Sequence, residues 1–126
     1  TADTPGTITV EGTDAQGNKI SEVIIPEAGN AVAGTKAFKT VTKVTGAGWA
    51  KDEEEKTNDT IKVGYGNELG LPFAVDSADD ILLGILGTTI TAHNPTVSTP
   101  ASVAGTTVDM STGTYDGTKK AFVFVA

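Results

Sequence analysis

His93, the single histidine of this 126-residue chain, is the side chain best suited to acid–base or metal chemistry near neutral pH. It stands beside Asn94-Pro95, with no histidine partner in the sequence and no carboxylate next to it. The chain also has no cysteine, which removes thiolate catalysis, cysteine-ligated metals and disulfides together. A loop histidine with a local hydrogen bond therefore explains His93 better than a zinc-binding or catalytic role.

Carboxylates and serines are the other groups that could do chemistry. Asp79-Asp80 and Asp52–Glu55 could form the acid pair of a glycosidase, but the second group belongs to Lys51–Asp59, a charged run typical of an exposed loop. The serines stand at 21, 77, 98, 102 and 111, and none has a Gly-x-Ser-x-Gly or Ser-x-x-Lys context. Asp14–Asn18 lacks the ligand pattern of a calcium loop, and turn chemistry accounts for it. We predict no enzymatic activity, no catalytic residue, no metal site and no cofactor.

Charge bears on the class of partner. The formal net charge is −7, and all nine cationic residues are lysines, so the fork-shaped guanidinium that recognises phosphate and base edges is missing. This composition argues against nucleic-acid binding. No apolar run approaches the roughly 18 residues that a spanning helix needs, and we predict no membrane segment.

The elements that would position these residues read as short strands from the start of the chain. Thr7–Thr13 and Lys19–Ile25 are rich in β-branched residues, and the polar turn Asp14–Gly17 lies between them. Gly17 can adopt the positive φ that closes a hairpin. The first 25 residues therefore predict a β-hairpin.

The same pattern of short strands and glycine-rich corners continues along the chain, which contains 21 threonines and 15 glycines. The further predicted strands are Phe38–Thr45, Thr60–Tyr65 with Ile61, Val63 and Tyr65 facing inward, Ile81–Leu86, Thr88–Ala92, Thr106–Met110 and Lys119–Ala126. Gly66–Pro72 reads as a bend, and Asn94-Pro95 and Thr99-Pro100 mark loop or edge segments. Ser77 could cap one helical turn before Ile81–Leu86, for which we favour a strand over a helix.

These elements predict an all-β fold. We expect an antiparallel β-sandwich, jelly-roll or immunoglobulin-like, of eight or nine short strands with at most one short helical turn. The length suits one domain, which we place at 7–126, preceded by an extended arm at 1–6 because Pro5-Gly6 interrupts regular structure.

Several segments resemble small structural proteins encoded near the head genes of tailed bacteriophages. They are Thr9–Asn18, Ile20–Glu22, Ala33–Thr42, Thr60–Gly64, Gly70–Phe73 and the stretch from Asn94-Pro95 through Thr107–Met110 to Asp116-Gly117 and the last strand. The resemblance covers most of the chain from about residue 7, and the acidic insertion at Lys51–Asp59 departs from it. It implies a non-enzymatic capsid decoration, cement or head-fibre protein. Such a protein is β-rich and often trimeric, and binds the major capsid protein on the exterior of a virion assembled in the host cytoplasm.

A decoration protein needs a docking patch, and two segments suit one. They are the N-terminal arm and an apolar corner, which together contain the candidate interface residues Thr1, Ala2, Asp3, Thr4, Pro5, Leu69, Leu71, Pro72 and Phe73. The corner has an alternative interpretation as ordinary core, and the arm as a frayed terminus.

Two other functions are compatible with parts of the sequence. A carbohydrate- or receptor-binding module, such as an adhesin or fibre domain, requires an exposed aromatic platform, for which Trp49 is the best candidate. A small hydrolase would require His93 to meet a serine or an acid in a pocket. We expect the structural, capsid-decorating protein.

Overall fold

Short antiparallel strands make up nearly all of the regular structure. The computed structural model describes residues 6–49, 60–66, 68–87, 89–91, 94–109, 118 and 120–126. Within them lie the strands β1 (Thr7–Thr13), β2 (Lys19–Ile24), β3 (Thr40–Ala47), β4 (Glu68–Gly70), β5 (Ile81–Leu86), β6 (Thr89–Thr91), β7 (Asn94–Val97), β8 (Thr106–Asp109) and β9 (Ala121–Val125), and the 3-10 helix η1 (Ala78–Asp80). The predicted all-β class, with eight or nine strands and one helical turn, is confirmed.

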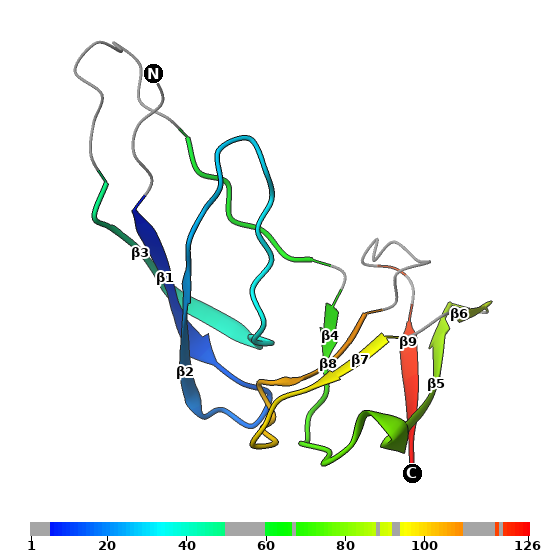
Figure 1. Ribbon diagram of the computed structural model, residues 1–126. Helices are drawn as coiled ribbons and strands as arrows, with labels where there is room; N and C mark the ends of the chain where they lie inside the picture. The colour runs from blue at the N-terminus through cyan, green and yellow to red at the C-terminus, as the bar shows by residue number, and fades with distance from the viewer. Residues whose placement is uncertain are drawn as a thin grey trace.

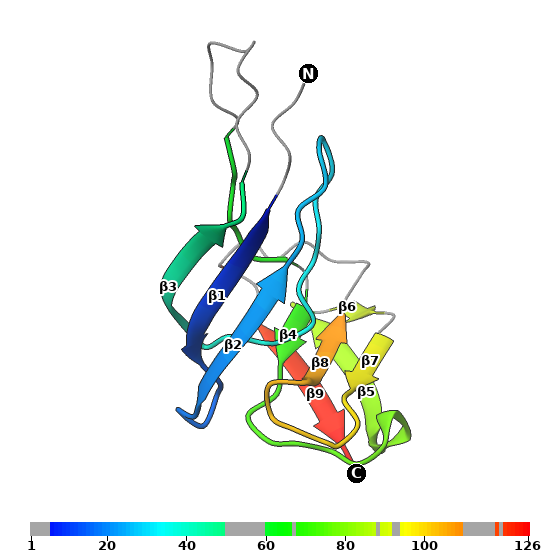
Figure 2. The same ribbon diagram turned by 60° about the vertical axis from the view of Figure 1, so that its left-hand side comes forward.

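The strands form three sheets of three strands each. The first sheet has the order β2-β1-β3, the second β4-β8-β7 and the third β6-β5-β9, and every pair is antiparallel. Figure 1 shows the first sheet on one side of the molecule and the other two beside each other on the opposite side. Figure 2, turned by 60°, shows the same separation. The predicted arm, apart from Gly6, lies outside the described residues, as do His93 and the acidic run Lys51–Asp59.

The hairpin β1–β2 forms as its sequence predicts. Gly17 has a φ of 89°, which a residue with a side chain rarely adopts, and its amide donates to the carbonyl oxygen of Asp14 at 3.1 Å. A second backbone bond, 2.9 Å from the Asp14 amide to the Asn18 oxygen, closes the turn. The register then pairs Thr13 with Lys19, so the two strands align over their full length.

The turn also depends on the buried carboxylate of Asp14. One oxygen accepts the amides of Gln16 and Asn18, each at 2.9 Å, and the other accepts the Asn18 side-chain amide at 3.0 Å. These bonds, led by the Asn18 side chain, lower the pKa of Asp14 below its usual 3.8, although burial opposes them. Turn chemistry thus uses both carboxylate oxygens, as the sequence indicates.

Asp14 makes the stability of the fold depend on acidity. Because its pKa is depressed in the folded chain, ionised Asp14 contributes stability above pH 3.8, and this contribution is lost as the pH falls through the folded pKa. Asp14→Asn keeps a carbonyl oxygen in the turn but removes the charge. We expect urea unfolding to show the variant less stable than the parent at pH 7, with the gap closing in acid. A gap of equal size at pH 7 and pH 2 would contradict this.

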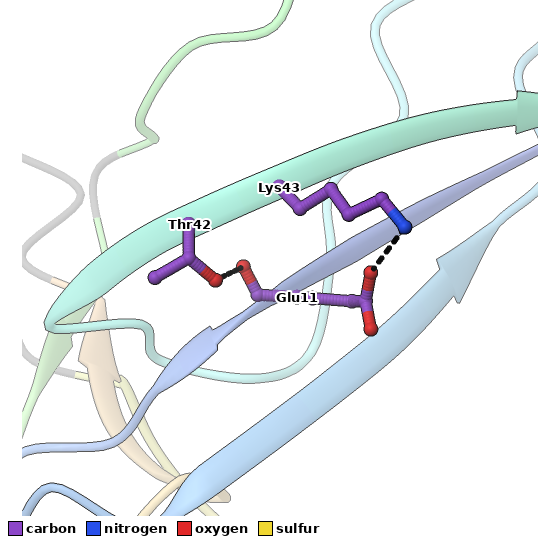
Figure 3. Close-up of polar contacts among 3 residues, drawn as sticks. All are labelled: Glu11, Thr42 and Lys43. Atoms are coloured by element: carbon purple, nitrogen blue, oxygen red, sulfur yellow. Dashed lines mark hydrogen bonds and ion pairs between the residues drawn. The ribbon is translucent and has the colours of Figure 1, made fainter.

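Polar contacts line one face of the first sheet between β1 and β3. The Thr42 hydroxyl donates to the backbone oxygen of Glu11 at 3.2 Å, and the Lys43 ammonium lies 3.5 Å from the Glu11 carboxylate, as Figure 3 shows. Both charged side chains are largely exposed, so water screens the ion pair and it contributes little to stability. This sheet therefore relies on backbone pairing and on Ile8 and Val10, which are buried on its other face.

The main hydrophobic core lies between the second and third sheets. Leu71, Val75, Ile81 and Val108 are buried in it, and Val108 is completely inaccessible. Partly buried side chains from both sheets pack around them: Leu69, Val97, Ala121, Val123 and Val125. The two sheets thus pack face to face in a sandwich-like arrangement, which burying a Val, Leu or Ile side chain stabilises by about 1.5–3 kcal/mol each.

The alternative expectations for Ser77 and the segment after it are both met. The Ser77 side chain accepts the amide of Asp79 at 3.2 Å and caps η1, and β5 follows at Ile81–Leu86 as the predicted strand. Asn94-Pro95 also lies where expected, because β7 is an edge strand of the second sheet and Pro95 leaves no neighbour's hydrogen bond unmade on its open side.

Two expectations were wrong. The structure has no strand at Thr60–Tyr65, and Ile61, Val63 and Tyr65 are exposed rather than inward, Tyr65 by 91%. Alternation alone does not make a strand, and no described strand pairs with this one. The predicted bend at Gly66–Pro72 contains β4, because Leu69 and Gly70 pair with residues of β8.

Candidate docking face

The groups that could do chemistry are scattered in the part of the chain that the structure describes. There, no three His, Cys, Asp or Glu side chains come together in a way that could hold a metal ion. Asp79 and Asp80 sit together on η1, and the Ser98 and Ser102 hydroxyls bond to each other at 2.9 Å in the loop before β8. Among the described residues no helix is long and apolar enough to cross a membrane.

The predicted apolar corner divides between core and surface. Leu71 is buried in the core and Leu69 packs against it, as the alternative interpretation of the corner has it. Pro72 is exposed, with its carbonyl oxygen accepting the Gln16 side chain at 3.3 Å, and Phe73 is 42% exposed. Thr1, Ala2, Asp3, Thr4 and Pro5 lie outside the described residues. Pro72 and Phe73 are thus the described corner residues that a partner could reach.

Trp49, the candidate aromatic platform, lies against the first sheet. Its indole is half-buried, and a β-carbon placed on Gly46 would lie 3.1 Å from the indole nitrogen and 3.7 Å from the Ile8 side chain. The ring therefore covers the glycine in β3 instead of standing free. This position suits packing over an apolar strand better than stacking on a sugar.

The outer face of the third sheet carries the most concentrated apolar surface among the described strands. Phe122 and Phe124 alternate with the core residues of β9, so their rings point away from the core and are 49% and 51% exposed. Cross-strand pairing places Ile85 opposite Phe122 and Leu83 opposite Phe124. Side chains opposite each other in an antiparallel pair share a face. We call these four side chains the aromatic face.

Leu82 extends the apolar surface at one end of the aromatic face. The register of β5 against β9 shifts between Ile81 and Leu83, and Leu82 at this irregularity is 59% exposed. Two half-exposed phenylalanines alone leave on the order of 200 Å² of apolar surface in water. With Leu82 added, the area approaches the roughly 300 Å² at which exposed patches on a monomer are often functional.

Charge is confined to the two ends of this sheet. Lys120, exposed, directly precedes β9, and its carbonyl oxygen accepts the Gly87 amide at 2.8 Å. At the opposite end the Ala126 amide donates to the Asp80 oxygen at 2.8 Å, and Asp79 is exposed beside it. The aromatic face thus has a cationic end and an anionic end, with uncharged side chains between them.

The sequence interpretation missed this face, although it placed the last strand correctly. Ala121–Val125 is apolar at every position, so both sides of the strand read as core. The alternation of Phe with Ala and Val was the one available signal. Comparisons of the chain with protein-family models, with curated proteins and with solved structures find no match.

Proposed function

We propose that this protein is a non-enzymatic structural component of a tailed-bacteriophage particle that decorates and stabilises the capsid shell. It acts as a homo-oligomer on the exterior of a virion assembled in the host cytoplasm, and its partner is the major capsid protein. The observation that carries the proposal is the aromatic face, since half-exposed Phe122 and Phe124 on a rigid sheet form a surface suited to a partner.

Two further features support a role in docking. The sequence resembles phage head proteins over most of its length, and its net charge of −7 keeps the remaining surface soluble and self-repelling. A small apolar face binds weakly when it acts alone. A shell presents the same site many times, so an oligomer that engages several sites gains affinity without a larger contact.

The proposal is tested with expanded, empty shells of the capsid protein encoded in the same genome. The protein is expected to saturate them at a fixed stoichiometry and to raise their disruption temperature, because a ligand that binds only the intact shell stabilises it. Failure to bind the shells, with no rise in disruption temperature, would overturn the proposal.

Paired variants identify the surface that docks. Phe122→Thr together with Phe124→Thr is expected to weaken shell binding at least tenfold, because it removes the exposed rings but keeps residues that favour strands. Val23→Thr is the matched control, since Val23 is 61% exposed on the first sheet and should leave binding unchanged. Urea unfolding of each variant confirms that the fold persists. Equal losses in both variants would assign docking to another surface.

A further inference from the structure

The free edges of the three sheets differ in how well they are protected against pairing with another chain. β7 carries Pro95, β4 and β6 have three residues each, and on β2 the Lys36 ammonium donates to the Ser21 carbonyl oxygen at 2.7 Å. β3 is long but carries Lys43. Proline, charge, short length and covering groups are the devices by which natural sheets blunt an edge. Each of these five edges has at least one of them.

β9 is the exception. It stands at the end of the third sheet, pairs with β5 on one side, and contains neither a charged residue nor proline or glycine over Ala121–Val125. A short apolar strand of this composition readily pairs with a copy of itself. In the described part of the chain, the outer edge of β9 has no strand beside it.

We propose that two copies of this chain pair through β9, antiparallel, about a two-fold axis that passes beside Val123. Each third sheet then continues into the other, which gives one six-stranded sheet. The symmetry places Val123 opposite Val123 of the second copy, Ala121 opposite Val125, and Phe122 opposite Phe124. A second copy is the occupant because the contact is complementary to itself in both shape and charge.

The aromatic rings favour this register. Phe122 and Phe124 point to the same face of β9, so the two-fold pairing brings four rings together in two cross-strand pairs. Aromatic pairs across antiparallel strands stabilise a sheet beyond the area that they bury. A register shifted by one residue would break both pairs and set each ring opposite a core-facing side chain.

The charged ends of the sheet favour the antiparallel direction. Lys120 precedes β9 in one copy, and the symmetry places it opposite Ala126 of the second copy, whose amide bonds to Asp80. Each cationic end therefore lies beside the other copy's anionic end, with Asp79 exposed nearby. Parallel pairing would place the two Lys120 side chains side by side, where like charges repel.

The size of the contact sets its strength. Five residues from each copy pair, against roughly 20–30 residues a side in a standard stable interface, so the dimer is weak, with a Kd on the order of 10–100 µM. The contact is two-fold, so it gives a dimer and not the trimer that the sequence resemblance implies. It also joins two aromatic faces into one. The inference does not rest on the proposed function, because pairing is measured without a capsid.

Disulfide trapping tests the register directly, since the chain has no cysteine of its own. Val123→Cys, mildly oxidised, is expected to give a covalent dimer on a non-reducing gel. Ala121→Cys alone and Val125→Cys alone are expected to stay largely monomeric, whereas their equimolar mixture forms the mixed dimer. Failure of Val123→Cys to cross-link, or equal cross-linking of all three single variants, would overturn the proposed register.

Sedimentation equilibrium tests the contact without cross-linking. The unmodified protein is expected to shift from monomer to dimer between roughly 5 and 500 µM. Phe124→Lys should raise the dissociation constant at least tenfold, because the symmetry brings two added charges next to the pairing edge. Leu82→Lys is the control, since Leu82 is 59% exposed on β5, away from that edge. A monomer throughout, a trimer, or equal effects of the two substitutions would overturn the pairing.

Discussion

Leu71→Ala is expected to lower the free energy of unfolding by about 3 kcal/mol, measured by urea denaturation. Leu71 is 5% exposed and belongs to the core cluster with Val108, which is completely buried. Its amide also donates to the Thr106 carbonyl oxygen at 3.1 Å, so the backbone is held in place when the side chain is cut back. A cavity therefore remains between the second and third sheets, and lost contacts add to the lost hydrophobic transfer.

Phe73 provides the matched comparison, because it lies two residues away in the same apolar corner. It is 42% exposed and lies outside the core cluster, so Phe73→Ala is expected to cost less than about 1 kcal/mol. If the corner takes part in docking, this variant weakens shell binding while its unfolding curve changes little. Similar unfolding costs for the two substitutions would show that the corner is not divided into core and surface.

Local chemistry made parts of this fold predictable. The hairpin β1–β2 needs only a positive-φ glycine, a turn carboxylate and β-branched residues, and Gly17 and Asp14 are adjacent in the chain to the strands that they join. Ile81–Leu86 was likewise placed correctly from a short apolar run that follows a capping serine. In both cases the stabilising contacts, or the signals for them, lie within a few residues.

Pairing between distant segments was less predictable. Thr60–Tyr65 has the alternation of a strand, yet no described strand lies beside it. Conversely, Leu69 and Gly70 become a strand because β8, almost 40 residues later, provides the partner. A strand is defined by its neighbour, and a single sequence does not state which neighbour it has.

The candidate docking face was hidden for a related reason. Composition cannot tell which side of an all-apolar strand is covered, and β9 is apolar on both sides. Only the packing of Val123 and Val125 against the second sheet shows that the phenylalanines are the uncovered side. The docking residues predicted from the sequence were apolar residues at a glycine-rich corner, and part of that corner proved to be the core itself.

Gly12→Ala is expected to destabilise the protein by about 3 kcal/mol, although it adds a single methyl group. Gly12 is a buried residue of β1, next to the point where the register with β3 shifts. A β-carbon there would overlap the carbonyl oxygen of Thr40 and lie 3.0 Å from the Phe38 ring. The main obstacle is backbone, which cannot turn aside as a flexible side chain does, so β3 must move away from β1.

The control is Gly64→Ala, where an added β-carbon meets no atom within 4 Å and the glycine φ is not positive. This substitution should change the free energy of unfolding by no more than about 0.5 kcal/mol, because it neither strains the backbone nor fills a packed space. Urea unfolding of both variants separates a general cost of replacing glycine from the cost of close strand approach. Equal costs at the two positions would mean that Gly12 is not where β1 and β3 come together.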